Sequence, residues 1–223
     1  MLKIENTEVY GWEAAIRGMR NPMNSWEQSD SGMCEVICGE DEELPEYPTY
    51  EFKVGAKDLD LMHRLRKAGT DHRKFMRMIT VTADIYGPLY WLKEYDTYKV
   101  GTVANSCSTM HKIHAKEFTP DDFSLEHLSA LYLQTIHNTI AMLNLARLAY
   151  LQATDPKEKK FFWWQMIQLL PSSYNQRRTI LLNYEVLANI YKSRKNHKLD
   201  EWHTFCEWIE GLPYSELITG VEQ

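Results

Sequence analysis

Helix start and stop signals divide the second half of the sequence and constrain the fold more than any other feature. Thr119 precedes Pro120 and Asp122, a cap that predicts a helix running from residue 119 to about Ala153. Three further helices are predicted over residues 155–170, 172–194 and 199–211, ended by Pro171, Arg194 and Gly211. The pattern predicts a helical C-terminal half.

The first half mixes helical and strand patterns. The predicted helices cover residues 11–19, 57–69 and 88–95, and the predicted strands cover residues 32–39 and 75–87. The acidic, proline-bearing stretch between them, residues 39–52, is expected to be a surface loop. We find no internal repeat and no low-complexity linker, so we predict one α+β domain spanning residues 1–223.

Charge and hydropathy limit the class of partner. The chain carries 25 Lys and Arg against 31 Asp and Glu, a formal net charge of −6. This balance argues against coating nucleic acid or a membrane surface. No apolar run approaches the roughly 20 residues of a membrane-spanning helix, and the first residues lack the apolar core of a signal peptide. We therefore expect a cytoplasmic protein.

Three arginines stand in the otherwise apolar stretch 169–194, namely Arg177, Arg178 and Arg194. Because the chain as a whole is acidic, they indicate a local target. A phosphorylated small molecule and the carboxylates of a neighbouring subunit both remain open. On one helix, Arg177 and Arg194 would lie near the same face but about 25 Å apart. They would then contact one small ligand only if a second subunit or a bend brought them together.

The four cysteines are too few and too scattered for a disulfide framework, so we expect free thiols at Cys34, Cys38, Cys107 and Cys206. Cys107 has two nearby histidines, in the sequence CSTMHKIH, but no fourth ligand is apparent. A polar loop explains the same residues, and we assign no metal site.

The stretch 169–194 resembles a segment of the flavin-dependent thymidylate synthases. In that family the segment reads Leu-Pro, then Tyr-Thr-Arg, then Val-Asn-Ala-Arg-Ser-Leu-Met-Asn, then Leu-Arg. The matching positions, without a gap, are Leu170, Pro171, Arg177, Asn183, Leu187, Asn189 and Arg194. His197 matches the family's following histidine after a shift of one residue.

Residues 97–111 occupy the place of the family's signature, Arg-His-Arg-x-x-Ser-x-Asn-Glu-x-Ser. Lys99 stands for the second arginine and Thr102 for the first serine. Asn105 stands for the asparagine after one inserted residue, and Ser108 for the last serine. The departures are Thr97 and Tyr98 for the first arginine and histidine, Ser106 for the glutamate, and Met110 for a later arginine.

The resemblance implies an antiparallel or mixed sheet with a helical C-terminal half, and a homotetramer that builds each site from several subunits. It implies that Arg177, Arg194 and Ser108 contact the substrate dUMP, with Arg194 also catalytic. The residues it implies for the cofactor FAD are His72, Lys99, Thr102, Asn105, Asn183 and His197. From the residues alone, salt-bridged arginines, a buried amide at Asn183 and a solvated His72 explain the pattern as well.

Two functions follow from the resemblance and its departures. The first is a divergent flavin-dependent thymidylate synthase, a methyltransferase-type enzyme acting on a pyrimidine deoxynucleotide. The second keeps the fold and the nucleotide cleft without catalysis, as a nucleotide-binding or sequestering protein encoded by a virus such as a phage. Because neutral side chains cannot grip phosphate as guanidinium does, we expect weak or absent flavin.

Two more stretches carry expectations. The aromatic sequence FFWWQMIQLL, residues 161–170, is typical of a core or of a subunit interface. The polar stretch 20–31, which contains Trp26, has no counterpart in the family, and we expect it to line the same cleft.

Overall fold

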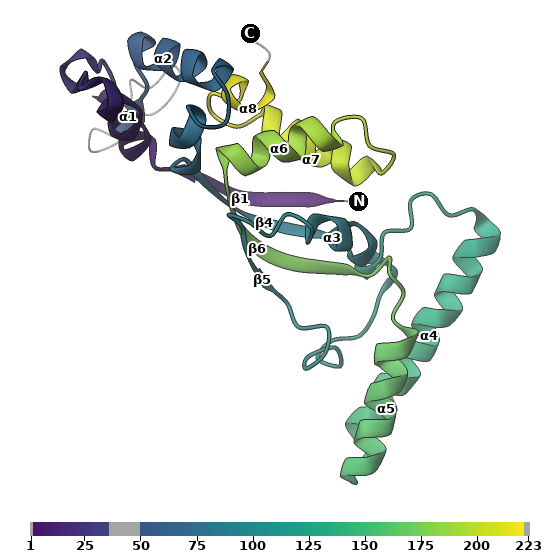
Figure 1. Ribbon diagram of the computed structural model, residues 1–223. Helices are drawn as coiled ribbons and strands as arrows, with labels where there is room; N and C mark the ends of the chain where they lie inside the picture. Colours follow the sequence, from purple (N-terminus) through teal and green to yellow (C-terminus); the bar gives the residue numbers. More distant parts are fainter. Residues whose placement is uncertain (1, 36–49, 221–223) are drawn as a thin grey trace.

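The computed structural model describes residues 2–35 and 50–220. Its main sheet has four strands, β1 (Lys3–Tyr10), β4 (Thr80–Pro88), β5 (Val103–Ser106) and β6 (Asn175–Asn183). They lie in the order β1-β4-β6-β5, and every neighbouring pair is antiparallel (Figure 1). Strands from distant parts of the chain thus meet in one sheet, and the predicted α+β class is confirmed.

Helices and one small hairpin complete the described chain. The α-helices are α1 (Trp12–Arg20), α2 (Ala56–Lys67), α3 (Leu89–Tyr95), α4 (Ala130–Gln152), α5 (Pro156–Leu169), α6 (Tyr184–Arg194), α7 (Asp200–Glu210) and α8 (Glu216–Thr219). The 3-10 helices are η1 (Asn21–Met23), η2 (Trp26–Gln28), η3 (Arg73–Arg77) and η4 (Pro120–Asp122). Strands β2 (Gly32–Glu35) and β3 (Tyr50–Lys53) form a separate antiparallel pair. Within the described ranges no helix is long and apolar enough to cross a membrane.

The two faces of the main sheet differ in chemistry. On β4, Val81, Ala83 and Ile85 are buried, whereas the alternate residues Thr82 and Asp84 are only partly covered. Helices α3, α6 and α7 lie over the buried face (Figure 1). The other face is polar, as expected for an antiparallel sheet with one side open to solvent. We call it the polar face.

Helices α4 and α5 form a hairpin that projects away from the sheet (Figure 1). The hairpin has its own hydrophobic cluster, made by Ile113, Phe118, Phe123, Ile140, Leu143, Ala146 and Met166. Three of these residues, Ile113, Phe118 and Phe123, come from the segment between β5 and α4. The cluster therefore fixes that connecting segment against the hairpin.

The predicted helix over residues 172–194 is wrong in its first part. Residues 175–183 form β6, and only residues 184–194 are helical. Ile180 and Leu182 alternate with Thr179 and Leu181, so the strand buries one face while pairing with β4 and β5. Backbone pairing on both sides outweighs local helix propensity here. Asn183 then begins α6, because its Oδ1 accepts the N–H of Val186 at 3.0 Å.

Two other predicted elements begin later than expected. The capping box of Thr119 and Asp122 is present, but it closes only η4, and α4 begins at Ala130. The chain leaves the helical path because Phe123 is buried in the hairpin cluster and forms an isolated bridge with Tyr174. The predicted strand over 75–87 begins at Thr80 in β4, since residues 73–77 form η3.

The remaining predicted elements match the structure where it describes them. Helices α1, α2, α3, α5 and α7 occur at the predicted positions. Of the predicted strand 32–39, residues 32–35 form β2, and residues 36–39, with Cys38, lie outside the described residues. Residues 40–49 of the predicted acidic loop also lie outside them, whereas residues 50–52 belong to β3.

A buried ion pair fastens the polar stretch 20–31 to α2. Nε of Arg20 lies 2.6 Å from Oδ1 of Asp58, and both side chains are almost fully buried. The hydroxyls of Ser29 and Ser31 donate to the second oxygen of Asp58, at 2.6 and 2.7 Å. Burial raises the pKa of Asp58, but the hydrogen bonds from Ser29, Ser31 and Arg20 outweigh it, so the pKa is below its ordinary value.

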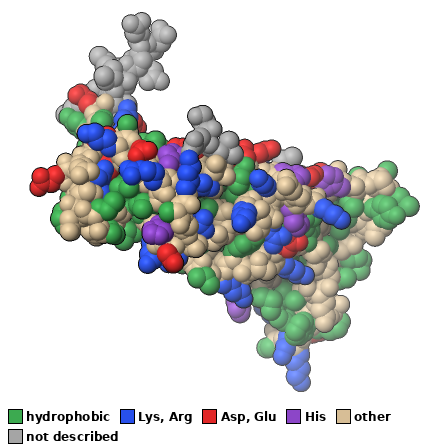
Figure 2. All heavy atoms as spheres, turned by 45° about the horizontal axis from the view of Figure 1, so that its top comes forward, with side chains coloured by type: hydrophobic (Ala, Val, Ile, Leu, Met, Phe, Trp, Pro, Cys, Tyr) green, Lys and Arg blue, Asp and Glu red, His purple; other side chains and the backbone are tan. Residues whose placement is uncertain are grey.

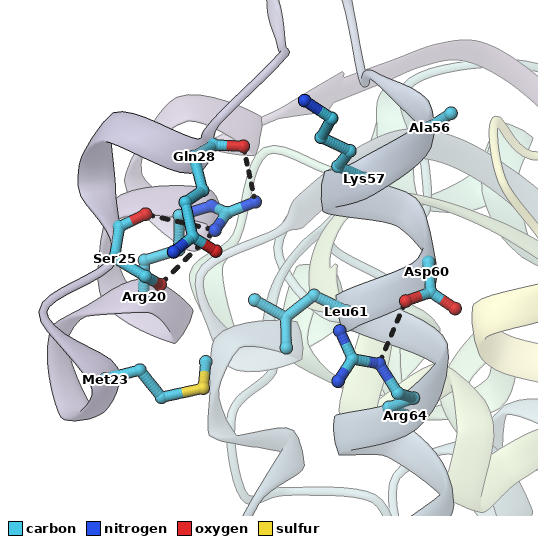
Figure 3. A pocket seen from close by; sticks show the side chains of 9 residues that line it. All are labelled: Arg20, Met23, Ser25, Gln28, Ala56, Lys57, Asp60, Leu61 and Arg64. Carbon is cyan, nitrogen blue, oxygen red and sulfur yellow. Dashed lines mark hydrogen bonds and ion pairs between the residues drawn. The ribbon is translucent and has the colours of Figure 1, made fainter.

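This stretch lines a groove of about 630 Å³ against α2 (Figure 3). Within one protomer the groove contains none of the residues predicted for substrate or cofactor, so residues 20–31 do not line a cleft with them there. Of its basic lining residues, Arg20 pairs with Asp58 and Arg64 with Asp60, and Lys57 is the third. Because the predicted residues lie elsewhere, we place the candidate site elsewhere.

We predict that Asp58→Asn lowers the free energy of unfolding by about 3–5 kcal/mol, because it leaves the buried Arg20 charge without its partner. Asp60→Asn is the matched control, since Asp60 pairs with Arg64 on the same helix but both side chains are exposed. Asp60→Asn is expected to lower the free energy of unfolding by at most about 0.5 kcal/mol. Urea unfolding at one protein concentration measures both, and equal losses would contradict the prediction.

Candidate functional site

The polar face of the sheet places predicted site residues beside one another. The strand register sets Arg177 opposite Tyr86 and Thr179 opposite Asp84. Asn105 on β5 lies opposite Thr179, on the other side of β6. Directly opposed residues of antiparallel strands share a face, so all five belong to the polar face. Sequence patterns alone could not bring these residues together, because they depend on strand pairing between distant segments.

Asp84 organises this face. Its carboxylate accepts hydrogen bonds from Oγ1 of Thr179 at 2.5 Å, Nδ2 of Asn6 at 2.9 Å and Nη2 of Arg177 at 2.7 Å. These bonds hold the pKa of Asp84 well below its ordinary value, so the group stays ionised. The Nε and Nη1 groups of Arg177 form no hydrogen bond within the described residues. Arg177 is thus oriented by one nitrogen and keeps other donors for a ligand.

Strand β6 also holds the loop that follows β5. The N–H of Cys107 donates to the carbonyl of Arg177 at 2.9 Å. The side-chain amide of Gln176 donates to the carbonyl of Cys107 at 2.6 Å. Ser108 comes next, and its Oγ accepts the N–H of His111 at 2.8 Å. Because the Ser108 oxygen acts as an acceptor in this turn, its hydroxyl proton is available to a ligand.

The hairpin holds the same loop from the other side. Trp163 on α5 donates to the carbonyl of Met110 at 2.7 Å, and Arg147 on α4 donates to the carbonyl of His114 at 3.0 Å. The side chain of Asn144 accepts from the Phe118 N–H at 2.9 Å and donates to its carbonyl at 2.8 Å. Residues 107–118, which we call the β5–α4 loop, are therefore fixed along their length.

A cavity of about 260 Å³ lies between the β5–α4 loop and β6. Two residues predicted to contact substrate, Ser108 and Arg177, both line it. Its other lining residues are Tyr86, Cys107, Thr109, Lys112, Ile113, Lys116, Phe118, Tyr174, Asn175 and Gln176. The structure thus brings the signature segment and the stretch 169–194 to one cavity, which is the candidate site.

Arg194 lies in a different environment. It belongs to α6, which covers the opposite face of the sheet from Arg177 (Figure 1). Its Nη1 lies 2.8 Å from Oε2 of Glu94, and its Nε donates to the hydroxyl of Tyr98 at 2.9 Å. The guanidinium also lies over the ring of Trp202, at 4.8 Å from the centroid. The predicted single helix that would carry Arg177 and Arg194 on one face is therefore wrong.

The residues predicted for FAD are dispersed within one protomer. Thr102 and Asn183 lie at the other end of β5 and β6, where the Thr102 hydroxyl donates to the carbonyl of Tyr98. His197 lies beside Glu94, with Nε2 at 3.4 Å from the carboxylate.

The remaining three, His72, Lys99 and Asn105, belong to different segments of the chain. His72 is exposed at the start of η3, and Lys99 is exposed between α3 and β5. Asn105 is on the polar face. A strand advances about 3.3 Å per residue, so Asn183 lies roughly 20 Å along β6 from Arg177. Asn105 on the polar face and His197 beside Glu94 thus lie on opposite sides of the sheet within one protomer.

The structure gives no support to a metal at Cys107, His111 and His114. Among the described residues, no group of three or more His, Cys, Asp or Glu side chains could hold an ion. The three described cysteines, Cys34, Cys107 and Cys206, are free thiols as predicted.

Sequence reasoning missed several residues of the cavity. Tyr86 was treated only as part of a strand, and Lys112 lies just beyond the signature. The sequence feature that marks Lys112 is its position directly before the apolar residue Ile113. The hairpin cluster buries Ile113.

Solved structures share this fold across nearly the whole chain. No protein-family model matches the sequence, and no curated protein matches it. A flavin-dependent thymidylate synthase, ThyX, from Helicobacter pylori, complexed with FAD and dUMP, has a TM-score of 0.67 at 15% identity, covering 99% of this chain and 100% of that chain. A second Helicobacter pylori ThyX structure, also with FAD and dUMP, has a TM-score of 0.66 at 16% identity. It covers 99% of this chain and 98% of that chain.

A third match is PolB, a UMP/dUMP methylase from Streptomyces cacaoi bound with 5-Br dUMP. It has a TM-score of 0.57 at 12% identity and covers 99% of this chain and 95% of that chain. At these identities the likeness establishes the fold. The fold expected from the resemblance, that of the flavin-dependent thymidylate synthases, is confirmed.

Proposed function

We propose that this chain binds a pyrimidine deoxynucleotide such as dUMP in the cavity between the β5–α4 loop and β6. One observation carries the proposal: Ser108 and Arg177, placed far apart in the sequence, line the same cavity. The solved proteins that share the fold hold dUMP or 5-Br dUMP. The cavity is slightly smaller than the roughly 300–1,000 Å³ of a typical ligand pocket, which suits a mononucleotide better than a dinucleotide.

The lining chemistry suits a nucleotide. Arg177 offers guanidinium donors to an anion, and Ser108 offers a hydroxyl proton. Tyr86 and Tyr174 provide aromatic rings against which a pyrimidine can stack. Burial raises the pKa of the Tyr174 phenol to about 12, so the ring carries no charge to repel the ligand at neutral pH.

Arg194 takes part in our proposal only through a second subunit. Within one protomer it lies on the covered side of the sheet and is engaged by Glu94, Tyr98 and Trp202. A substrate contact or a catalytic role for Arg194 thus requires the site of a neighbouring copy. A neighbouring copy is also required to bring all the residues predicted for FAD to the cavity.

The projecting hairpin supports an oligomer, which we propose is a homotetramer. Apolar residues surround α4, but only Ile140, Leu143 and Ala146 are buried. A helix that is apolar all round is normally buried. Figure 2 shows apolar side chains gathered on the projecting part. The exposed ones on the hairpin are Leu131, Tyr132, Met142, Leu145, Leu148, Leu151, Phe161, Trp164 and Leu169.

A second candidate function is nucleotide binding or sequestration without catalysis, in a protein of viral origin. The signature's first histidine is replaced by Tyr98, whose hydroxyl is occupied by Arg194. The signature's later arginine is replaced by Met110, which has no charge to hold phosphate. These replacements favour a site that keeps the nucleotide and has a weakened flavin site. If the enzyme is active, it is a thymidylate synthase of the flavin-dependent type.

We predict that dUMP binds the purified protein and that Arg177→Ala weakens binding by roughly 10- to 100-fold, the loss of a charge-assisted hydrogen bond. Arg64→Ala is the control, because Arg64 is an exposed arginine on α2 that pairs with Asp60 and does not line the cavity. Calorimetric titration with dUMP measures each affinity, with circular dichroism as the check on folding. Absence of dUMP binding in the unaltered protein would refute the proposed function.

We predict that the protein is a tetramer in solution and that Leu145→Glu produces smaller species, because a charge enters the apolar surface of α4. The control is Val100→Glu, at a position that is more exposed but lies in the loop before β5. Multi-angle light scattering at micromolar concentration reports the mass of each. A strict monomer in the unaltered protein would exclude shared sites.

We predict that the protein is purified with much less than one flavin per chain. The physical reason is that its signature region has lost guanidinium groups that grip phosphate bidentately. Visible absorbance of the purified protein measures the flavin content. A yellow preparation with one flavin per chain would contradict this prediction and favour the enzyme over the sequestering protein.

A further inference from the structure

Two lysines of the β5–α4 loop line the candidate cavity, and they differ in how their charges are used. Lys116 forms an ion pair with Asp122, whose carboxylate is almost fully buried. The ammonium group of Lys112 forms no hydrogen bond or ion pair within the described residues, although the carbonyl of Lys112 accepts the N–H of Ala115. The same loop thus presents one neutralised ammonium group and one available ammonium group at the cavity.

The cavity contains no acidic residue that could neutralise Lys112. None of its lining residues is Asp or Glu. Two carboxylates next to the cavity are already committed to other basic residues of its lining, Asp84 to Arg177 and Asp122 to Lys116. An ammonium group without a partner, at a concave site beside a guanidinium group, favours an anionic ligand. In an acidic chain this local excess of positive charge is a specific feature of the cavity.

The backbone around Lys112 is fixed. The carbonyl of Met110 accepts from Trp163, and the carbonyl of His114 accepts from Arg147. Ile113, the next residue, is buried in the hairpin cluster. Lys112 therefore extends from an anchored loop, and binding has to order only its side chain. Such preorganisation lowers the entropic cost of gripping a ligand.

We propose that Lys112 holds the phosphate group of the nucleotide, together with Arg177 and Ser108. This inference rests on the proposed function. It names the side chain that supplies a positive charge to the phosphate of the bound nucleotide. The position at which the resembled signature has its later arginine is Met110, two residues earlier. Lys112 restores a positive charge to the same loop, as a point charge without the planar fork of arginine.

The test compares dUMP with deoxyuridine, which lacks the phosphate. Lys112→Gln is expected to weaken dUMP binding by roughly 10- to 100-fold and to leave deoxyuridine binding unchanged. Lys112→Arg, which keeps the charge, is expected to retain most of the dUMP affinity. Lys192→Gln is the control, an exposed lysine on α6. Calorimetry and ligand-observed NMR measure the affinities.

The outcomes separate this inference from the proposed function. If the unaltered protein binds dUMP and Lys112→Gln binds it equally well, Lys112 does not hold the phosphate, and the proposed function stands. If Lys112→Gln weakens dUMP and deoxyuridine by the same factor, the lysine acts on the shape of the cavity and the inference is overturned. If the unaltered protein binds neither ligand, both the inference and the proposed function fail.

Discussion

Strand pairing of β6 on both of its edges is the constraint on which the rest of the site depends. β6 pairs with β4 over its full length and with β5 over residues 178–181. The alternation of side chains then sends Arg177 to the polar face and Arg178 to the covered face, where it pairs with Asp96. At the end of the strand, Asn183 caps α6 and turns the chain onto the covered face. Two neighbouring arginines thus acquire different roles through backbone geometry.

The hairpin contributes the second half of the site. Its cluster buries Ile113 and Phe118, and its polar side chains hold the backbone of the β5–α4 loop. The loop would otherwise be a long connection without regular structure, and such segments are usually mobile. Here hydrogen bonds and buried side chains hold the loop that bounds the cavity. The same hairpin carries an exposed apolar surface, so one element both holds the loop of the cavity and presents apolar side chains to solvent.

Local signals in the sequence predicted the elements that local interactions stabilise. Helix α5 lies where it was expected, with Asp155 as its cap, and Gly211 ends α7 as expected. β6 was predicted as helix because its stability comes from pairing with segments about 70 to 100 residues earlier, which no local pattern records. The family resemblance nevertheless pointed to Arg177 and Ser108, which line one cavity, since it carries information about distant pairing. It did not point to Lys112, which lies beyond the resembled signature.

The central claim is that a nucleotide occupies the cavity on the polar side of the sheet, and the thiol of Cys107 can report on it directly. Cys107 lines the cavity, whereas Cys34 is also exposed but lies on β2, away from the cavity lining, and serves as an internal control. Cys206 is buried, and burial raises its pKa to about 11, so its thiol reacts slowly. The measurement is the alkylation rate of each cysteine by peptide mass spectrometry, with and without dUMP. Bound dUMP is expected to slow alkylation of Cys107 and leave Cys34 unchanged. Saturating dUMP that binds the protein but leaves the Cys107 rate unaltered would show that the nucleotide lies elsewhere.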